Sequence, residues 1–213
     1  MNLLTEALPN TVDIGGGAWP INTDFREGVR FELLMQTGTL TDEERMGRAL
    51  RLFYPKLPED ISAALDGMLW FYSCGRYEPR KPAAGDSGPQ KKQREKKVYD
   101  FDQDAELIFA AFRAVYGIDL NTVEGLHWWK FRALFSTLPA DCEFCKVMGY
   151  RAMDTKGLSK KQKQHYEKMK RLYALKNEVD VGSALSLGER NQRMREYVDR
   201  RFEEMEAGEK MTP

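Results

Sequence analysis

The sequence has little cysteine, little histidine and no excess of charge, and each shortage argues against a class of function. Three cysteines among 213 residues are too few, and odd in number, for a disulfide-stabilised scaffold, which indicates a reducing compartment. Lysine and arginine total 33 against 33 acidic residues, so no net field draws the whole molecule to nucleic acid or to an anionic membrane. No apolar run approaches the roughly 20 residues needed to cross a bilayer.

The start of the chain and its composition predict a globular intracellular protein. The segment Met1-Asn2-Leu3-Leu4 lacks the charged and apolar regions of a signal peptide. Apolar residues make up 42% of the sequence and aromatic residues 11%, which is typical of a chain that buries a core. We therefore expect a soluble protein in the cytoplasm.

Turn and cap signals predict a hairpin and three helices in the first third of the chain. Gly15-Gly16-Gly17 separates the β-favouring residues 11–14 and 18–21, which indicates a hairpin with Pro20 on an edge. Gly75 marks the end of the third helix. The helix starts are predicted at Thr23 or Asp24, at the capping-box pair Thr41 and Glu44, and after Pro58.

The next stretch, residues 76–98, is rich in proline, glycine and charge and loses helical periodicity, so it predicts a flexible linker. Its basic second half, residues 91–97, is followed at once by a group of acidic residues, which favours local charge neutralisation. Acidic residues also suit the positive end of a helix. A helix is therefore predicted from Asp104 to Gly117, where glycine supplies a left-handed end.

A second helix is predicted to begin at Asn121 or Thr122 and to include Leu126-His127-Trp128-Trp129-Lys130-Phe131. Helical spacing divides its apolar residues into two stripes, one for each tryptophan. A surface helix ordinarily needs one apolar side, so the second stripe predicts a contact with another subunit or a partner. A large core is the competing interpretation, because tryptophan is favoured in cores and at interaction hot spots alike. The residues assigned to partner binding are Trp128, Trp129, Phe131, Phe135 and Leu138.

The remaining sequence predicts further helices and a mainly α fold. Asp141 is the predicted cap of a helix after Pro139, and Ser159 opens a basic helix. A last charged helix is expected after a break at residues 177–186. The predicted organisation is a multi-helix bundle with an N-terminal β-hairpin and helical block (1–75), a flexible charged linker (76–98), a Trp-rich helical block (99–176) and a charged helical extension (177–213).

The sequence contains only incomplete motifs for metal binding, catalysis or phosphate binding. Cys142 and Cys145 have the spacing of half a zinc site or of a redox pair, but the sequence contains no second paired motif, which favours buried small apolar residues. His127 has no neighbouring nucleophile pattern, so a hydrogen-bonded structural histidine is expected. The glycine triplet lacks the Gly-Lys-Ser/Thr of a phosphate loop. We predict no enzyme activity, catalytic residue, metal site or cofactor.

Two basic segments, residues 91–97 and 160–171, raise the alternative of nucleic-acid binding. Tyr166 and Tyr173 are suited to stack on bases, but no recognisable nucleic-acid-binding motif accompanies them. The sequence therefore favours a solvated charged face over nucleic acid as a partner.

Several segments of the sequence resemble the phage gene-product-fifteen family of Gram-positive siphophages and prophages. The similarity spans roughly residues 1–175, on motifs specific enough to matter. The segments are Tyr99-Asp100-Phe101-Asp102-Gln103-Asp104-Ala105-Glu106-Leu107-Ile108, Tyr116-Gly117-Ile118-Asp119-Leu120, Leu126-His127-Trp128-Trp129-Lys130-Phe131, Asn22-Thr23-Asp24-Phe25-Arg26 and Trp70-Phe71-Tyr72-Ser73-Cys74-Gly75.

Members of that family are encoded between the major tail protein and the tape-measure protein, where tail assembly chaperones usually lie. The resemblance therefore implies a non-catalytic chaperone in the bacterial host cytoplasm. Its expected partners are the tape-measure protein, further copies of itself and the tail-tube protein, with no membrane. Two alternatives stay open, a structural component of the finished tail and a nucleic-acid-binding phage protein.

Overall fold

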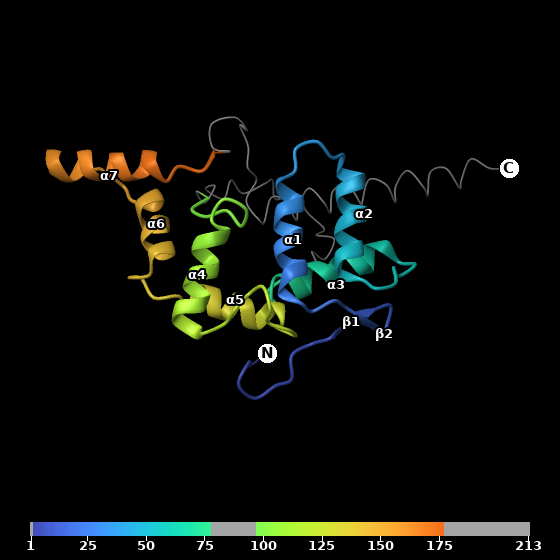
Figure 1. Ribbon diagram of the computed structural model, residues 1–213. Helices are drawn as coiled ribbons and strands as arrows, with labels where there is room; N and C mark the ends of the chain where they lie inside the picture. The colour runs from blue at the N-terminus through green and yellow to red at the C-terminus, as the bar shows by residue number, and fades with distance from the viewer. Residues whose placement is uncertain (1, 78–96, 177–213) are drawn as a thin grey trace. The chain divides into compact units, whose positions relative to one another are not determined.

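The computed structural model describes residues 2–77 and 97–176, which form one hairpin and seven helices (Figure 1). This confirms the prediction of a mainly α fold with a hairpin near the N-terminus. The linker predicted at 76–98 lies almost wholly outside the described residues, and the C-terminal extension lies entirely outside them. The elements are β1 (Thr11–Ile14), β2 (Gly17–Pro20), α1 (Phe25–Gln36), α2 (Asp42–Phe53), α3 (Ile61–Tyr72), α4 (Ala105–Tyr116), α5 (Trp128–Ser136), α6 (Glu143–Ala152) and α7 (Lys160–Leu172).

The described chain divides into two compact units. The first contains residues 2–77 together with Gly125–Trp129, and the second contains residues 97–124 and 130–176. Helix α5 therefore begins in the first unit and continues in the second. The tryptophan pair, which the sequence placed in the 99–176 block, belongs to the first unit.

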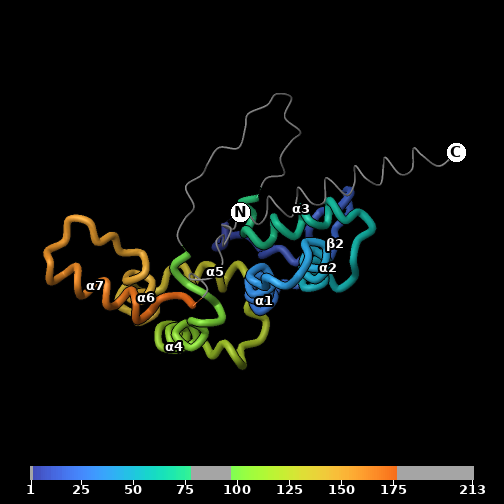
Figure 2. The backbone as a smooth tube through the Cα atoms, turned by 90° about the horizontal axis from the view of Figure 1, so that it is seen from above, coloured from blue at the N-terminus to red at the C-terminus, as the bar shows by residue number. Residues whose placement is uncertain are grey.

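In the first unit, β1 and β2 pair antiparallel and α3 packs against β1. The predicted hairpin is present and pairs Val12 with Trp19 and Ile14 with Gly17. Gly17 therefore belongs to β2, whereas the sequence placed it in the turn. Val12 and Ile14 alternate with exposed residues along β1 and are buried, so one face of the short sheet joins the core. Helix α1 packs against α2 and α2 against α3, an arrangement that can be followed in Figure 1 and, from above, in Figure 2.

The first three helices start where their caps predicted. The Asp24 carboxylate accepts the backbone N–H of Arg26 at the start of α1. Thr41 and Glu44 form both halves of a capping box at the start of α2. Each of these contacts satisfies backbone N–H groups that the first helical turn leaves unpaired.

The core of the first unit is largely aromatic. The ring of Phe31 meets that of Tyr72 edge-to-face with centroids 4.6 Å apart, and Phe53 meets Phe71 in the same way at 6.1 Å. All four side chains are buried. Such edge-to-face pairs add to the free energy gained by removing the rings from water.

In the second unit, α4 packs against α6 and α6 against α7. Helix α4 ends at Gly117, whose φ of +68° confirms the predicted left-handed end. Ser159 and Gln162 form a capping box at the start of α7, as the sequence predicted for Ser159. No residue of α7 is buried.

Two predicted helix starts are wrong. Helix α5 begins at Trp128 rather than at Asn121 or Thr122, because Gly125 takes a φ of +63° and the backbone that follows pairs with residues 23–25 instead of continuing a helix. Helix α6 is capped by Cys142 rather than by Asp141, one residue later than predicted. None of the helices among the described residues has the length and apolar character that crossing a membrane requires.

Candidate functional site

The backbone around the tryptophan pair is fixed by a short pairing with the start of α1. Trp128 N–H donates to the carbonyl of Thr23 at 2.7 Å, and Phe25 N–H donates to the carbonyl of Leu126 at 2.9 Å. Between these two bonds, Asp24 and His127 form an antiparallel bridge. The first residues of α5 are therefore positioned by main-chain contacts before any side chain is considered.

Trp128 lies in the interior of the first unit with only 1% of its surface exposed. Its indole stacks on the ring of Tyr72, with centroids 5.4 Å apart and planes 15° from parallel. The indole Nε1–H donates to the carbonyl of Tyr72 at 2.8 Å. The opposite side of the ring lies against Gly28 in α1, where a Cβ atom would fall 2.3 Å from a ring carbon. Glycine at position 28 is thus what makes room for this indole.

Trp129 is also buried, at 3% exposure, and donates its Nε1–H to the carbonyl of Phe71 at 2.7 Å. Its ring lies 5.5 Å from that of Trp70, centroid to centroid. Phe71 and Tyr72 are the last two residues of α3, so their carbonyls lie beyond the reach of a following helical turn. The carbonyl of Phe71 also accepts the backbone N–H of Cys74 at 3.0 Å. The two adjacent indoles therefore act as side-chain caps for the C-terminal end of α3.

His127 is hydrogen-bonded through both ring nitrogens, which confirms the structural role predicted for it. Its Nδ1 accepts the backbone N–H of Trp129 at 3.0 Å, so the proton of the neutral ring is on Nε2. Nε2 then donates to the carbonyl of Pro9 at 3.0 Å. The histidine joins the N-terminal segment to the start of α5 and keeps no free nitrogen for proton transfer.

The other three residues assigned to partner binding lie in the second unit and are buried there as well. Phe131 stacks on Phe112 of α4, with centroids 5.0 Å apart and planes 12° from parallel. Phe135 packs against Phe144 of α6 at 5.3 Å. Leu138 accepts a hydrogen bond from the Cys145 thiol through its carbonyl. All five residues assigned to partner binding are thus buried against side chains of the chain itself.

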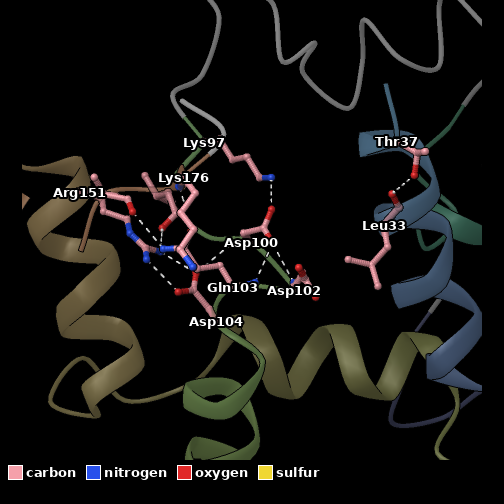
Figure 3. A network of polar contacts seen from close by, with 11 residues as sticks. Leu33, Thr37, Lys97, Asp100, Asp102, Gln103, Asp104, Arg151 and Lys176 are labelled. Atoms are coloured by element: carbon pink, nitrogen blue, oxygen red, sulfur yellow. Dashed lines mark hydrogen bonds and ion pairs between the residues drawn. The ribbon is translucent and has the colours of Figure 1, made fainter. Parts of the chain in front are cut away.

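The acidic segment before α4 forms a buried polar network with Arg151 of α6 (Figure 3). Arg151 Nη1 lies 2.6 Å from Asp104 Oδ2, and Nη2 lies 2.8 Å from Oδ1, in a bidentate ion pair. The same guanidinium donates to the carbonyls of Val98 and Tyr173, at 3.0 and 2.6 Å. Asp104 occupies the cap position of α4 but makes no side-chain cap bond, because its carboxylate is committed to Arg151 and to the N–H of Asp100.

Asp100 closes the network on the side of the basic segment. Its carboxylate pairs with Lys97 and accepts the backbone N–H groups of Asp102 and Gln103 (Figure 3). Burial alone would raise the pKa of Asp100, but the hydrogen bonds from Lys97 and from the two backbone groups outweigh it, and the pKa lies below its usual value. The predicted neutralisation of acidic by basic residues is present at Lys97, the one lysine of residues 91–97 that the structure describes.

The cysteine pair lies at the start of α6. Cys142 is the cap residue, and its sulfur accepts the backbone N–H of Cys145 at 3.5 Å. Both thiols are free and only partly buried, so the interpretation as buried apolar residues is wrong. Within residues 2–77 and 97–176, no group of three or more His, Cys, Asp or Glu side chains is placed to hold a metal ion.

No sequence motif points directly to Gly28 or Arg151, the two residues that complete these clusters. An indirect sign of Arg151 exists, because it follows Phe144 and Val147 at helical spacing and so lies on the buried stripe of α6. An arginine within an apolar stripe indicates a buried acidic partner.

These packing and polar clusters describe a helical protein whose prominent side chains hold its own fold together. A family model for "Bacteriophage Gp15 protein" matches residues 4–175 of the chain. The chain therefore belongs to the bacteriophage Gp15 family, which confirms the gene-product-fifteen part of the resemblance. The comparison with curated proteins found no match. The comparison with solved structures also found none.

Proposed function

We propose that this phage protein is a tail assembly chaperone that binds the tape-measure protein and keeps it soluble until tail-tube subunits assemble around it. The observation that carries the proposal is the family match over residues 4–175, since the resemblance places members of the family beside tape-measure genes. The role is non-catalytic and belongs in the bacterial host cytoplasm, with several copies of the chaperone acting on one client chain.

Helix α7 supports a binding role because it is the described helix that contributes least to the core. None of its residues is buried, and Leu172 exposes 66% of its surface. Lys168, Lys170 and Arg171 precede this leucine at the end of the helix. An exposed apolar side chain among charges is the kind of anchor that recognises an amphipathic client helix.

Direct contact between the client and the five residues assigned to partner binding stays a prediction. These residues are Trp128, Trp129, Phe131, Phe135 and Leu138. All five side chains are buried in the chain alone, and the two indoles also donate hydrogen bonds to α3. Contact through the indoles would first require those two bonds to break, at a cost of roughly 0.5–1.5 kcal/mol for each hydrogen bond lost. Binding through α7 carries no such cost.

Co-expression with tape-measure fragments tests the proposal. The soluble yield of the fragment is expected to rise with the wild-type chain and to fall back with Leu172→Asp, which places a charge on the exposed anchor. Leu4→Asp is the matched control, because Leu4 is a still more exposed leucine outside α7. A fragment that is equally soluble without the protein would contradict the chaperone function. Equal yields with both variants would contradict the use of α7.

The same experiment tests the α5 residues and the other partners. The variants Phe131→Leu and Phe135→Leu are first checked by urea unfolding, and only variants as stable as the wild type are used. If such a variant recovers less tape-measure fragment, the replaced side chain contacts the client. A tail-tube protein in place of the fragment measures the second expected partner, and light scattering measures self-association. Mass spectrometry of purified virions distinguishes the structural alternative, because a chaperone is depleted from the finished particle whereas a tail component persists.

A further inference from the structure

The two cysteines at the start of α6 have unequal surroundings. Cys142 has the extended backbone of a helix cap, with φ −68° and ψ 150°, and its sulfur lies 3.5 Å from the backbone nitrogen of Cys145. The Cys145 thiol donates to the carbonyl of Leu138, with sulfur and oxygen 3.6 Å apart, and also interacts with the Cys142 side chain. Both thiols are free and partly exposed to solvent.

The spacing permits a disulfide without movement of any other element. Residues three apart at a helix start have Cβ atoms about 5–6 Å apart, and a disulfide requires about 3.5–4.5 Å. Cys142 is outside the regular helix, so a small rotation of its extended backbone covers the difference. Its sulfur already lies beside the backbone of Cys145. Formation of the bond then requires that the Cys145 thiol give up its hydrogen bond to the Leu138 carbonyl and close the remaining distance to Cys142.

The surroundings also assign different roles to the two sulfurs. A backbone N–H at a helix start is a donor that a thiolate accepts, and it is directed at Cys142. Burial, the hydrogen bond with Cys142 and the charges of Cys142 and Asp141 together raise the pKa of the Cys145 thiol to about 11. Cys145 therefore stays protonated at neutral pH, and we assign the first attack to Cys142, the sulfur at the helix cap. Thiol–disulfide exchange needs one sulfur that attacks the reagent and a second thiol that resolves the mixed disulfide, and these two cysteines supply both.

We propose that Cys142 and Cys145 form a reversible redox site that exchanges with low-molecular-weight disulfides of the glutathione class. The Cys142 thiolate attacks one sulfur of the reagent, which breaks its S–S bond and releases the first thiol. The Cys145 thiol then loses its proton and attacks Cys142 Sγ, which releases the second thiol and closes the protein disulfide. Overall, two protein thiols are oxidised and one reagent disulfide is reduced to two thiols.

The test uses the full-length chain equilibrated in buffers of increasing ratio of oxidised to reduced glutathione. Remaining thiols are blocked with a maleimide, and the residues 133–146, which trypsin releases as one peptide, are analysed by mass spectrometry. The expected result is a peptide two hydrogens lighter that carries no maleimide, while Cys74 stays labelled. Addition of excess reduced glutathione is expected to restore both labels.

Three variants separate the roles. Cys145→Ala is expected to accumulate one glutathione on Cys142, because the resolving thiol is missing. Cys142→Ser keeps a good cap residue and hence a folded α6, and its Cys145 is expected to react at least tenfold more slowly than Cys142 does in Cys145→Ala. Cys74→Ala is the matched control and is expected to oxidise like the wild type.

Two results would overturn the proposal. One is a peptide 133–146 that keeps both maleimide labels in a large excess of oxidised glutathione. The other is equal glutathione addition to Cys142 and Cys145 in the single variants, since the proposed division of roles would then be absent. Neither result bears on the chaperone function, because the client assay uses fully reduced protein.

Discussion

Arg151 holds both carboxylate oxygens of Asp104, although the two residues are 47 positions apart and expose only 5% and 2% of their side chains. The guanidinium also donates to the carbonyls of Val98 and Tyr173, so one side chain joins the segment before α4, helix α6 and the segment after α7. This pair is the one buried ion pair among the described salt bridges of the second unit that spans distant segments. It therefore fixes the arrangement of that unit more than any exposed charge does.

Removal of one partner from this pair is expected to be severe. Arg151→Met leaves a buried carboxylate without its cation and is expected to lower the free energy of unfolding by about 3–5 kcal/mol. Lys146→Ala removes the exposed pair with Glu143, whose charged atoms are 3.8 Å apart, and is expected to change it by less than about 0.5 kcal/mol. Urea unfolding followed by circular dichroism measures both. Similar losses for the two variants would contradict a special role for Arg151.

Gly28→Ala is expected to disturb the Trp128 site. The added Cβ would lie 2.3–2.5 Å from three ring carbons, so the indole or α1 must shift, at an expected cost of about 1–3 kcal/mol in unfolding free energy. Gly47→Ala in α2 is the matched control, because nothing lies within 4 Å of its Cβ position. This control is expected to gain about 0.5–1 kcal/mol from helix propensity. Thermal unfolding of the two variants gives the comparison.

Because the Trp128 indole caps α3, its replacement is expected to cost more stability than replacement of a tryptophan that caps nothing. Trp128→Phe keeps an aromatic ring but removes the donor to the carbonyl of Tyr72, and a loss of about 1–3 kcal/mol in unfolding free energy is expected. Trp19→Phe, in the half-buried position on β2, is expected to lose less than about 0.5 kcal/mol. Hydrogen exchange at the end of α3 is expected to rise in the first variant alone. Unchanged exchange there would show that the indole does not cap this helix.

Asp100 predicts an acid dependence of stability. Because the pKa of Asp100 is lower in the folded chain, its contribution is complete at neutral pH. That contribution is lost as the pH falls below the unfolded value of about 3.9 and through the folded value. Asp100→Asn is expected to lower the free energy of unfolding at pH 7 by about 1–2 kcal/mol. The free energy of unfolding of this variant is also expected to decrease less than that of the wild type between about pH 5 and about pH 3.

Asp102→Asn is the control for this measurement, because the Asp102 side chain is exposed in the same segment. Urea midpoints measured across the pH range compare the two variants with the wild type. An Asp100→Asn curve parallel to the wild-type curve would show that Asp100 does not carry the acid dependence.

Local signals in the sequence were sufficient for most element starts in the described chain. The capping boxes at Thr41 and Ser159 depend on residues three positions apart, and the hairpin depends on a turn between neighbouring segments. Because the interacting residues lie within a few positions of one another in the sequence, these contacts could be predicted from it. Gly117 was predicted for the same reason.

The features that were not predicted depend on residues far apart in the sequence. Aspartate is a favoured cap residue, but the carboxylate of Asp104 forms an ion pair with Arg151 on another helix instead of capping α4. The start of α5 is set by pairing with residues 23–25, about a hundred positions earlier, so helical spacing alone placed it too early. The tryptophans looked like surplus apolar surface because nothing nearby reveals the aromatic core and the α3 carbonyls that receive them.

The capping of α3 by indoles 56 and 58 positions later bears on how the protein is made. At synthesis rates of roughly 5–20 residues per second, the ribosome needs about 3–11 seconds to extend the chain from Tyr72 to Trp128. Throughout that interval the nascent N-terminal portion lacks the ring that fills the space beside Gly28. Packing of the first unit is therefore completed only after the middle of the polypeptide has left the ribosome. A chain truncated before residue 129 is expected to aggregate.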